Sequence, residues 1–165
     1  MSGTAPIQVL IFELEKGRAV LGRIDAFYQS YLVRIAGTGP RLTEHAMVIA
    51  NSLSAWYTCL ETQFLRVSRF FENSLDARRW HQDLLGKMTL NLPGIREPMI
   101  AEETAFLLGE LLRFRHFQRY YFEFDYDWDR LDLVQKKYAQ VQPLLARDLD
   151  AFQAFLVRLA AAPGA

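Results

Sequence analysis

Apolar residues recur at steps of three and four along two long segments, and this spacing constrains the fold more than any other feature of the sequence. The first segment begins near Ile7 and ends before Gly37, Gly39 and Pro40. Its apolar positions are Leu10, Ile11, Leu14, Leu21, Ile24, Tyr28, Tyr31 and Ile35. Residues spaced in this way lie on one face of an α-helix, so the spacing predicts a long amphipathic helix.

The second segment follows Leu42 and keeps the same period. Its apolar positions are Met47, Ala50, Leu53, Trp56, Tyr57, Leu60, Phe64, Val67 and Phe71. Two helices of this length favour an antiparallel pair. Gly17 and Gly22 lie inside the first helix, where each costs about 1 kcal/mol relative to alanine, which indicates a bend or a close helix crossing.

Shorter helices are expected after the second segment. The first of them contains Trp80, Leu84, Leu85 and Met88. Turn and helix-breaking residues make the stretch from Thr89 to Met99 irregular. A helix rich in leucine, phenylalanine and arginine then extends from Ala101 to about Phe122.

An acidic connector leads into the last helix, which Asp127 or Asp129 can cap. Its apolar stripe consists of Leu131, Val134, Tyr138, Val141, Leu145, Leu149, Phe152, Phe155 and Leu159. Pro143 must kink or split this helix because proline has no amide proton. The sequence therefore predicts a single all-α domain over residues 1–165, with 160–165 as a frayed tail. It is a bundle of two long antiparallel helices, one short helix and two further helices, the last kinked at Pro143.

The composition favours one packed core and excludes several classes of protein. The chain has 165 residues, of which 51% are hydrophobic. Lysine plus arginine equals aspartate plus glutamate at 19 each, so no overall field attracts nucleic acid or an anionic membrane. Cys59 is the only cysteine, which suits the reducing cytoplasm, and we expect neither a secretion signal nor a membrane span.

The sequence offers little for metal or cofactor chemistry. His45, His81 and His116 are far apart, and none has a second histidine or cysteine at ligand spacing. Phosphate loops rich in glycine and nucleophilic serine elbows are absent from the sequence. We therefore expect no metal and no cofactor, and most familiar enzyme classes are excluded.

Two helical turns of this otherwise neutral chain contain four basic residues, Arg113, Arg115, His116 and Arg119. Arg115, Arg119 and Phe122 share one helical face. The helix dipole and the acidic run that follows can account for the cations as a solvated face. Alternatively, the three arginines form a phosphate-binding patch, because a guanidinium donates two hydrogen bonds at once to a phosphate.

Several short sequences carry a family resemblance. They are Ala55–Glu61, Trp80–Leu85, Leu92–Arg96, Glu110–Phe117 (ELLRFRHF), Asp127–Leu131 (DWDRL) and Asp148–Phe152. Over nearly its full length the chain resembles the HepT-like family of the HEPN superfamily, the ribonuclease half of toxin-antitoxin pairs. Such proteins cleave RNA without metal, using an arginine, four intervening residues, a histidine, one residue and a tyrosine.

The resemblance places Arg115 at the motif arginine, but Tyr120 stands at the histidine position and Phe122 at the tyrosine position. Cleavage needs a base, an acid and a cation for the phosphorane charge. A phenol titrates near 10, so Tyr120 is a poor base at neutral pH. His116 points away from Arg115 on an ideal helix and would need a second subunit to replace the base. The expected consequence is that cleavage is reduced or lost.

The resemblance also implies partners. Family members form homodimers, which would place two copies of Arg115 around a shared cleft. In the family a minimal nucleotidyltransferase adenylylates the motif tyrosine, and Phe122 has no hydroxyl to accept the group. Tyr120 or Tyr121 could be modified instead, or both could simply pack at the end of the bundle.

Three interpretations remain open. The first is a toxin homologue that keeps the arginine cleft, and possible RNA binding, without full cleavage activity. The second is a catalytically silent module that binds a nucleotidyltransferase or another protein. The third is an active ribonuclease with a rearranged site. The nucleic-acid interpretation requires Arg115 to be available to RNA. If its side chain instead forms internal ion pairs, remote from any cleft or subunit boundary, this interpretation fails.

Overall fold

The computed structural model of the protein describes residues 4–72, 80–120 and 126–162. Its helices in this part of the chain are α1 (Thr4–Ile35), α2 (Thr43–Glu72), α3 (Trp80–Met88), α4 (Glu102–Tyr120) and α5 (Trp128–Ala161). The only β pairing among these residues is an isolated bridge between Leu92 and Arg96. The predicted all-α bundle is confirmed over these residues, except that α5, with 34 residues, is as long as the predicted long pair α1 and α2.

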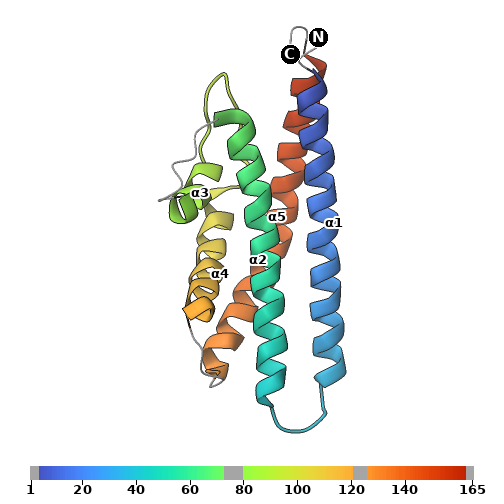
Figure 1. The fold of residues 1–165 in the computed structure, drawn as a ribbon, viewed down its shortest axis with the longest axis vertical. Coiled ribbons are helices and arrows are strands. Elements are labelled where there is room, and N and C mark those ends of the chain that lie inside the picture. The colour runs from blue at the N-terminus through green and yellow to red at the C-terminus, as the bar shows by residue number, and fades with distance from the viewer. Residues whose placement is uncertain (1–3, 73–79, 121–125, 163–165) are drawn as a thin grey trace.

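Helix α2 is the central element of the bundle (Figure 1). It runs antiparallel to α1 and also contacts α3, α4 and α5. Helix α5 packs against α1 on one side and against α4 on the other. The start of α1 and the end of α5 therefore lie at the same end of the molecule (Figure 1).

An aromatic cluster joins α1, α2 and α5 in the core. The ring of Tyr138 lies edge-on to Trp56 at 5.0 Å and to Tyr28 at 5.1 Å between centroids. Both phenols are buried, and their hydroxyls donate to polar side chains, Tyr138 to Asp25 at 2.7 Å and Tyr28 to Gln135 at 2.8 Å. Trp56 is thus a core residue, as its place in the apolar stripe predicts.

The helix ends follow the expected signals. Helix α1 ends just before Gly37 and Gly39, which both have positive φ. The N-cap of α5 is Asp127, whose carboxylate accepts from the backbone amides of Asp129 and Arg130 at 3.0 and 3.2 Å. Helix α5 continues through Ala161, which lies within the segment expected to be frayed, and residues 163–165 lie outside the described part.

Pro143 lies inside α5 without splitting it. In Figure 1 the first part of α5 leans toward the end of α4, whereas its later part runs beside α1. The bend agrees with the kink expected from the missing amide proton. None of the helices in the described part of the chain is long and apolar enough to cross a membrane.

The two glycines inside α1 have different surroundings. A Cβ atom at Gly17 would overlap the side-chain amide of Gln63 on α2, so Gly17 permits the close helix crossing that the sequence predicts. A Cβ atom at Gly22 would meet nothing within 4 Å. Of these two positions, only Gly17 faces a side chain that a Cβ atom would displace.

Arg96 ties the irregular segment after α3 to the end of α2. Its side chain is 0% exposed and donates to the carboxylate of Glu72 at 2.7 Å. It also donates to the backbone carbonyls of Lys87 at 2.7 Å and Leu90 at 3.1 Å. One guanidinium thus holds together the end of α2, the end of α3 and the loop that follows α3.

Candidate functional site at the contact of α2 and α4

Helix α4 carries the arginine-rich segment, residues 113–119. A buried carboxylate of α5 fixes the N-terminal end of this helix. Asp148 accepts from the backbone amide of Ala101 at 2.9 Å and from the hydroxyl of Thr104 at 2.5 Å. An acceptor at this place satisfies amides that a helix start leaves unpaired. The contact sets the position of α4 along α5.

Polar side chains line the contact between α2 and the second half of α4. This polar seam consists of Asn51, Ser54, Thr58, Glu61, Arg115 and Gln118. The four residues of α2 are spaced by three or four, so they form one row along the helix. The amide of Gln118 accepts from the Ser54 hydroxyl and donates to Asn51 at 3.2 Å.

Arg115 is held inside the seam. Its Nε donates to the hydroxyl of Thr58 at 2.9 Å, and its Nη2 lies 3.3 Å from Oε2 of Glu61. The side chain of Arg115 is 11% exposed and that of Glu61 is 6% exposed. The guanidinium and the carboxylate therefore neutralise each other in a largely dry contact between two helices.

One guanidinium nitrogen of Arg115 has no partner among the residues that the structure describes. This atom, Nη1, is buried and has no hydrogen-bond acceptor there. A buried donor left unpaired costs about 1–3 kcal/mol, so this atom is the part of the seam most able to gain from an added acceptor.

The buried carboxylate also affects its neighbours. Burial raises the pKa of Tyr57, one turn before Glu61 on α2, and the negative charge of Glu61 raises it further. The Arg115 cation acts in the opposite direction. Tyr57 is therefore a neutral phenol at physiological pH and offers no base to the site.

Two of the three predicted phosphate-binding arginines, Arg113 and Arg115, point in different directions. Arg113 is 70% exposed and pairs with Glu110 on its own helix at 3.1 Å, whereas Arg115 points into the contact with α2. His116 is partly exposed. The side chains of Arg119 and Tyr120, and residues Tyr121 and Phe122 entirely, lie outside the described part, so their roles stay predictions.

The aromatic residue after His116 meets a cation from the last helix. The guanidinium of Arg130 lies 3.9 Å from the ring centroid of Phe117. Such cation-π contacts are worth about 0.5–1 kcal/mol at exposed sites. Arg130 thus adds a positive charge beside the arginine-rich segment that sequence reasoning did not include.

Glu61 is the main residue of the site that sequence reasoning missed as a partner of Arg115. Its signal lies in the apolar stripe of α2, where Glu61 follows Tyr57 by four residues and precedes Phe64 by three. An acid on a buried stripe requires a cation or hydrogen-bond donors. The sequence indicates this need, but it does not identify which cation meets it.

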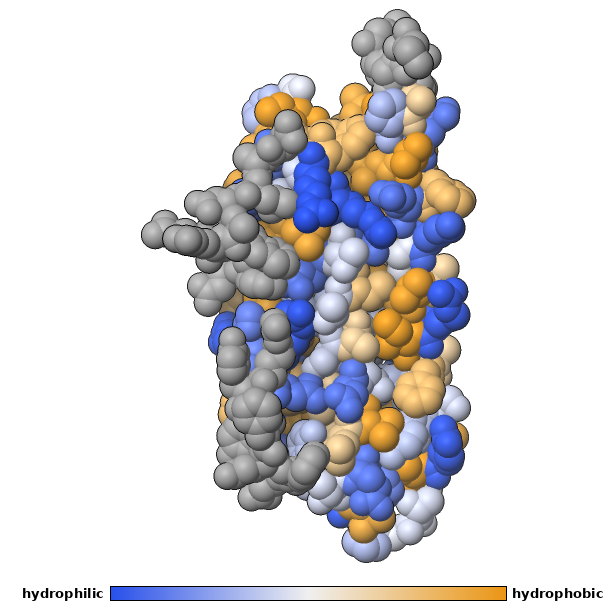
Figure 2. All heavy atoms as spheres, in the orientation of Figure 1, coloured by the Kyte–Doolittle hydropathy of each residue, from blue (hydrophilic) through white to orange (hydrophobic). Residues whose placement is uncertain are grey.

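A groove between α1 and α2 borders the seam at Asn51. Its volume is about 480 Å³, and its lining comprises Val20, Arg23, Ile24, Phe27, Val48, Asn51, Ser52 and Ala55. Figure 2 shows hydrophobic surface interspersed with polar side chains on the face that α1 and α2 present in Figure 1. The outer side of this helix pair is thus partly apolar.

The fold and the position of the motif arginine define a class: an all-α bundle whose α4 carries the arginine-rich segment against α2. A family model described as HepT-like protein matches residues 48–156, about two thirds of the chain. The chain belongs to the HepT-like family, which relates it to the HEPN toxins. No curated protein and no solved structure matches it.

Proposed function

We propose that this chain is a HepT-like homologue of ribonuclease toxins that has lost motif-dependent RNA cleavage and acts by binding a protein partner. The observation that carries the proposal is the internal pairing of Arg115 with Glu61 and Thr58. An arginine whose charge neutralises a buried carboxylate supports a phosphorane poorly, because leaving the pair would uncover a buried charge.

The motif positions support the same conclusion. Tyr120 stands where the family has its histidine, and a phenol is a weak base at neutral pH. Losing positioned acid-base catalysis costs about 10²–10⁴ in rate. With the base replaced and the arginine paired internally, two of the three catalytic elements are compromised.

The expected partners follow from family membership. A second copy of the chain would form a homodimer, and a minimal nucleotidyltransferase would be the antitoxin. Phe122 offers no hydroxyl for adenylylation, so binding without modification is the expected relation to such an enzyme unless Tyr120 or Tyr121 accepts the group. Sedimentation of the purified chain, alone and mixed with a candidate nucleotidyltransferase, measures both associations.

RNA binding is the second candidate function, and two observations favour it. Arg113 is largely exposed, and within the described part of the chain Nη1 of Arg115 lacks an acceptor, which a phosphate oxygen would supply. Binding through arginines weakens steeply as salt rises, whereas a protein interface with apolar anchors responds little. Salt dependence therefore separates the two candidates.

The test compares the wild-type chain with Tyr120→His, Arg115→Met and Arg113→Met in RNA binding and RNA cleavage. The proposal expects no cleavage by the wild type, normal growth of cells that express it, and no change of weak RNA binding in Arg115→Met beyond that in Arg113→Met. Cleavage by the wild type that Arg115→Met abolishes would contradict it. Circular dichroism checks that each variant is folded.

A further inference from the structure

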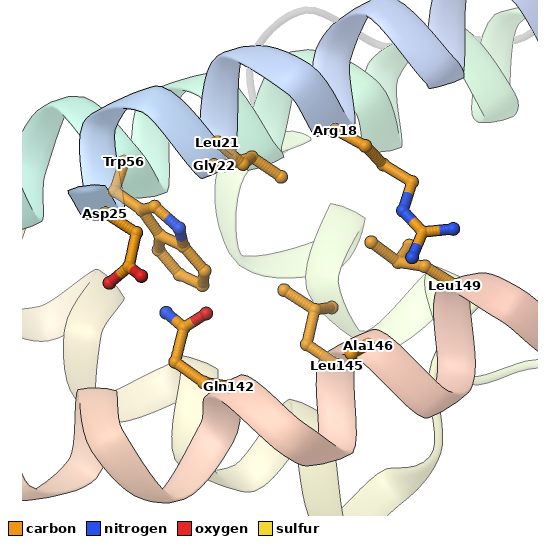
Figure 3. Close-up of a pocket in the computed structure, with 9 residues that line it drawn as sticks. All are labelled: Arg18, Leu21, Gly22, Asp25, Trp56, Gln142, Leu145, Ala146 and Leu149. Atoms are coloured by element: carbon orange, nitrogen blue, oxygen red, sulfur yellow. The ribbon is translucent and has the colours of Figure 1, made fainter.

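A cavity of about 150 Å³ lies between α1 and α5, and Trp56 of α2 forms part of its wall (Figure 3). Liquid water occupies roughly 30 Å³ per molecule, so the space holds about five waters or a ligand with about five non-hydrogen atoms. Figure 3 shows Asp25 and Gln142 at one end of the cavity and Arg18 at the other. Its polar groups are thus separated along its length.

The charges at the two ends are not equivalent. Arg18 pairs with Asp150 at 2.7 Å and donates to Gln153 at 3.2 Å, so its cation is already neutralised. The Asp25 carboxylate accepts only from Tyr138 and from Gln29, and no cation in the described part of the chain pairs with it. The cavity therefore carries an uncompensated negative charge at the Asp25 end.

The amide of Gln142 lies beside this charge. Its Nε2 is buried and finds no acceptor among the described residues. A half turn of the amide about its last torsion exchanges the nitrogen with the oxygen, which can then accept a hydrogen bond at the same place. Asp25 and Gln142 can thus act as two acceptors for one donor group between them.

The remaining walls fit an organic cation. Trp56 is 1% exposed, so its indole closes the wall between Asp25 and Leu145 (Figure 3) and does not offer an open face to the cavity. Leu145 and Leu149 give the remaining wall its apolar surface. Gly22 and Ala146 are both exposed and carry no large side chain, so they leave access to the cavity.

We propose that this cavity binds a small organic cation with a primary ammonium group, held by Asp25 and the amide oxygen of Gln142, with the indole of Trp56 as the wall beside them. An ammonium has three donors and no acceptor, which matches two acceptors beside an aromatic wall. The apolar side chains of Leu145 and Leu149 contact the carbon chain of the ligand. The proposal is independent of RNA cleavage and of the protein partner.

The test titrates butylamine into the full chain and follows the indole N–H signal of Trp56 by nuclear magnetic resonance, assigned with Trp56→Phe. We expect a saturable shift, and binding of 1-butanol and of butanoate about tenfold weaker or worse, because a hydrogen bond to a charged group is lost. Equal affinities for butylamine and butanol, or no shift with butylamine, would overturn the proposal.

Three variants complete the test. Asp25→Asn removes the charge and is expected to weaken butylamine binding at least about tenfold. As a control, Asp129→Asn removes an exposed carboxylate at the start of α5 and is expected to bind butylamine as the wild type does. If it weakens butylamine binding as much as Asp25→Asn does, general charge attraction explains the binding and the proposal is overturned. Ala146→Met narrows the opening of the cavity and keeps Asp25, so it serves as the test if Asp25→Asn does not fold. Unchanged butylamine binding by Ala146→Met would contradict the proposed site.

Discussion

Arg115 of α4 and Glu61 of α2 form an ion pair of 3.3 Å that is almost closed to solvent. The two residues are 54 positions apart in the sequence, and Thr58 supplies a second acceptor for the same guanidinium at 2.9 Å. The pair joins the arginine-rich segment to the central helix of the bundle. The motif arginine thereby acts as a brace between helices.

Replacing the buried arginine should cost far more stability than replacing the exposed one. Arg115→Met leaves Glu61 buried without its cation and is expected to lower the free energy of unfolding by about 3–5 kcal/mol. Arg113→Met, on the outer side of the same helix, should change it by less than about 0.5 kcal/mol. Urea denaturation measures both. Similar losses in the two variants would show that burial of Arg115 contributes little.

The two glycines of α1 should respond oppositely to alanine. Gly22→Ala gains helix propensity without a clash and is expected to raise the free energy of unfolding by about 0.5–1 kcal/mol. Gly17→Ala must displace Gln63, whose amide donates to the Cys59 carbonyl and accepts from Arg66, so it should lower stability. Thermal unfolding of both variants checks the difference in sign, and equal shifts would refute it.

Arg96 should be among the most sensitive positions outside the long helices. Arg96→Ala leaves several backbone carbonyls without their donor and leaves Glu72 with the Lys87 ammonium at 3.9 Å, and we expect a loss of about 3–5 kcal/mol of unfolding free energy. Arg96→Lys keeps the charge but has no planar fork, so it should restore only part of this stability. Full restoration by lysine would mean that charge alone matters.

Stability should fall in alkali because of the core phenols. Burial raises the pKa of Tyr28 to about 12, with Asp25 and Asp132 adding to the effect. Burial also raises the pKa of Tyr138, and its hydrogen bond to Asp25 raises it further. A phenol whose pKa is raised by folding stays neutral in the folded state, so its contribution to the free energy of unfolding is complete below the unfolded pKa near 10. That contribution is lost as the pH rises toward 12.

The measurement is the free energy of unfolding from pH 8 to about 11.5, spanning the unfolded phenol value. The wild type should lose stability above about pH 10, and the double variant Tyr28→Phe with Tyr138→Phe should lose it less steeply. Lysine titration affects both proteins alike. Identical slopes would show that the two phenols do not govern the alkaline limit.

The helices could be predicted because their signals are local. Apolar spacing gives the long pair α1 and α2, Gly37 and Gly39 end the first of them, and Asp127 caps α5 as expected. Each signal lies within a few turns of the residues that it governs, so no knowledge of the tertiary contacts is needed.

The site was less accessible to sequence reasoning because its chemistry depends on contacts between helices. Arg113 and Arg115 are two residues apart, yet one faces solvent and the other faces Glu61. Which arginine turns inward depends on how α4 rotates against α2, and the local sequence does not determine this. The cavity at Asp25 likewise requires the register of α1 against α5, which places Gly22 near Ala146.

A double-mutant cycle tests the central claim most directly. The free energy of unfolding is measured for the wild type, Arg115→Met, Glu61→Gln and the double variant. If the two side chains brace α4 against α2, their interaction energy should be about 1–3 kcal/mol, so that the second substitution costs much less than the first. Additive losses, together with RNA affinity that disappears in Arg115→Met alone, would contradict the account.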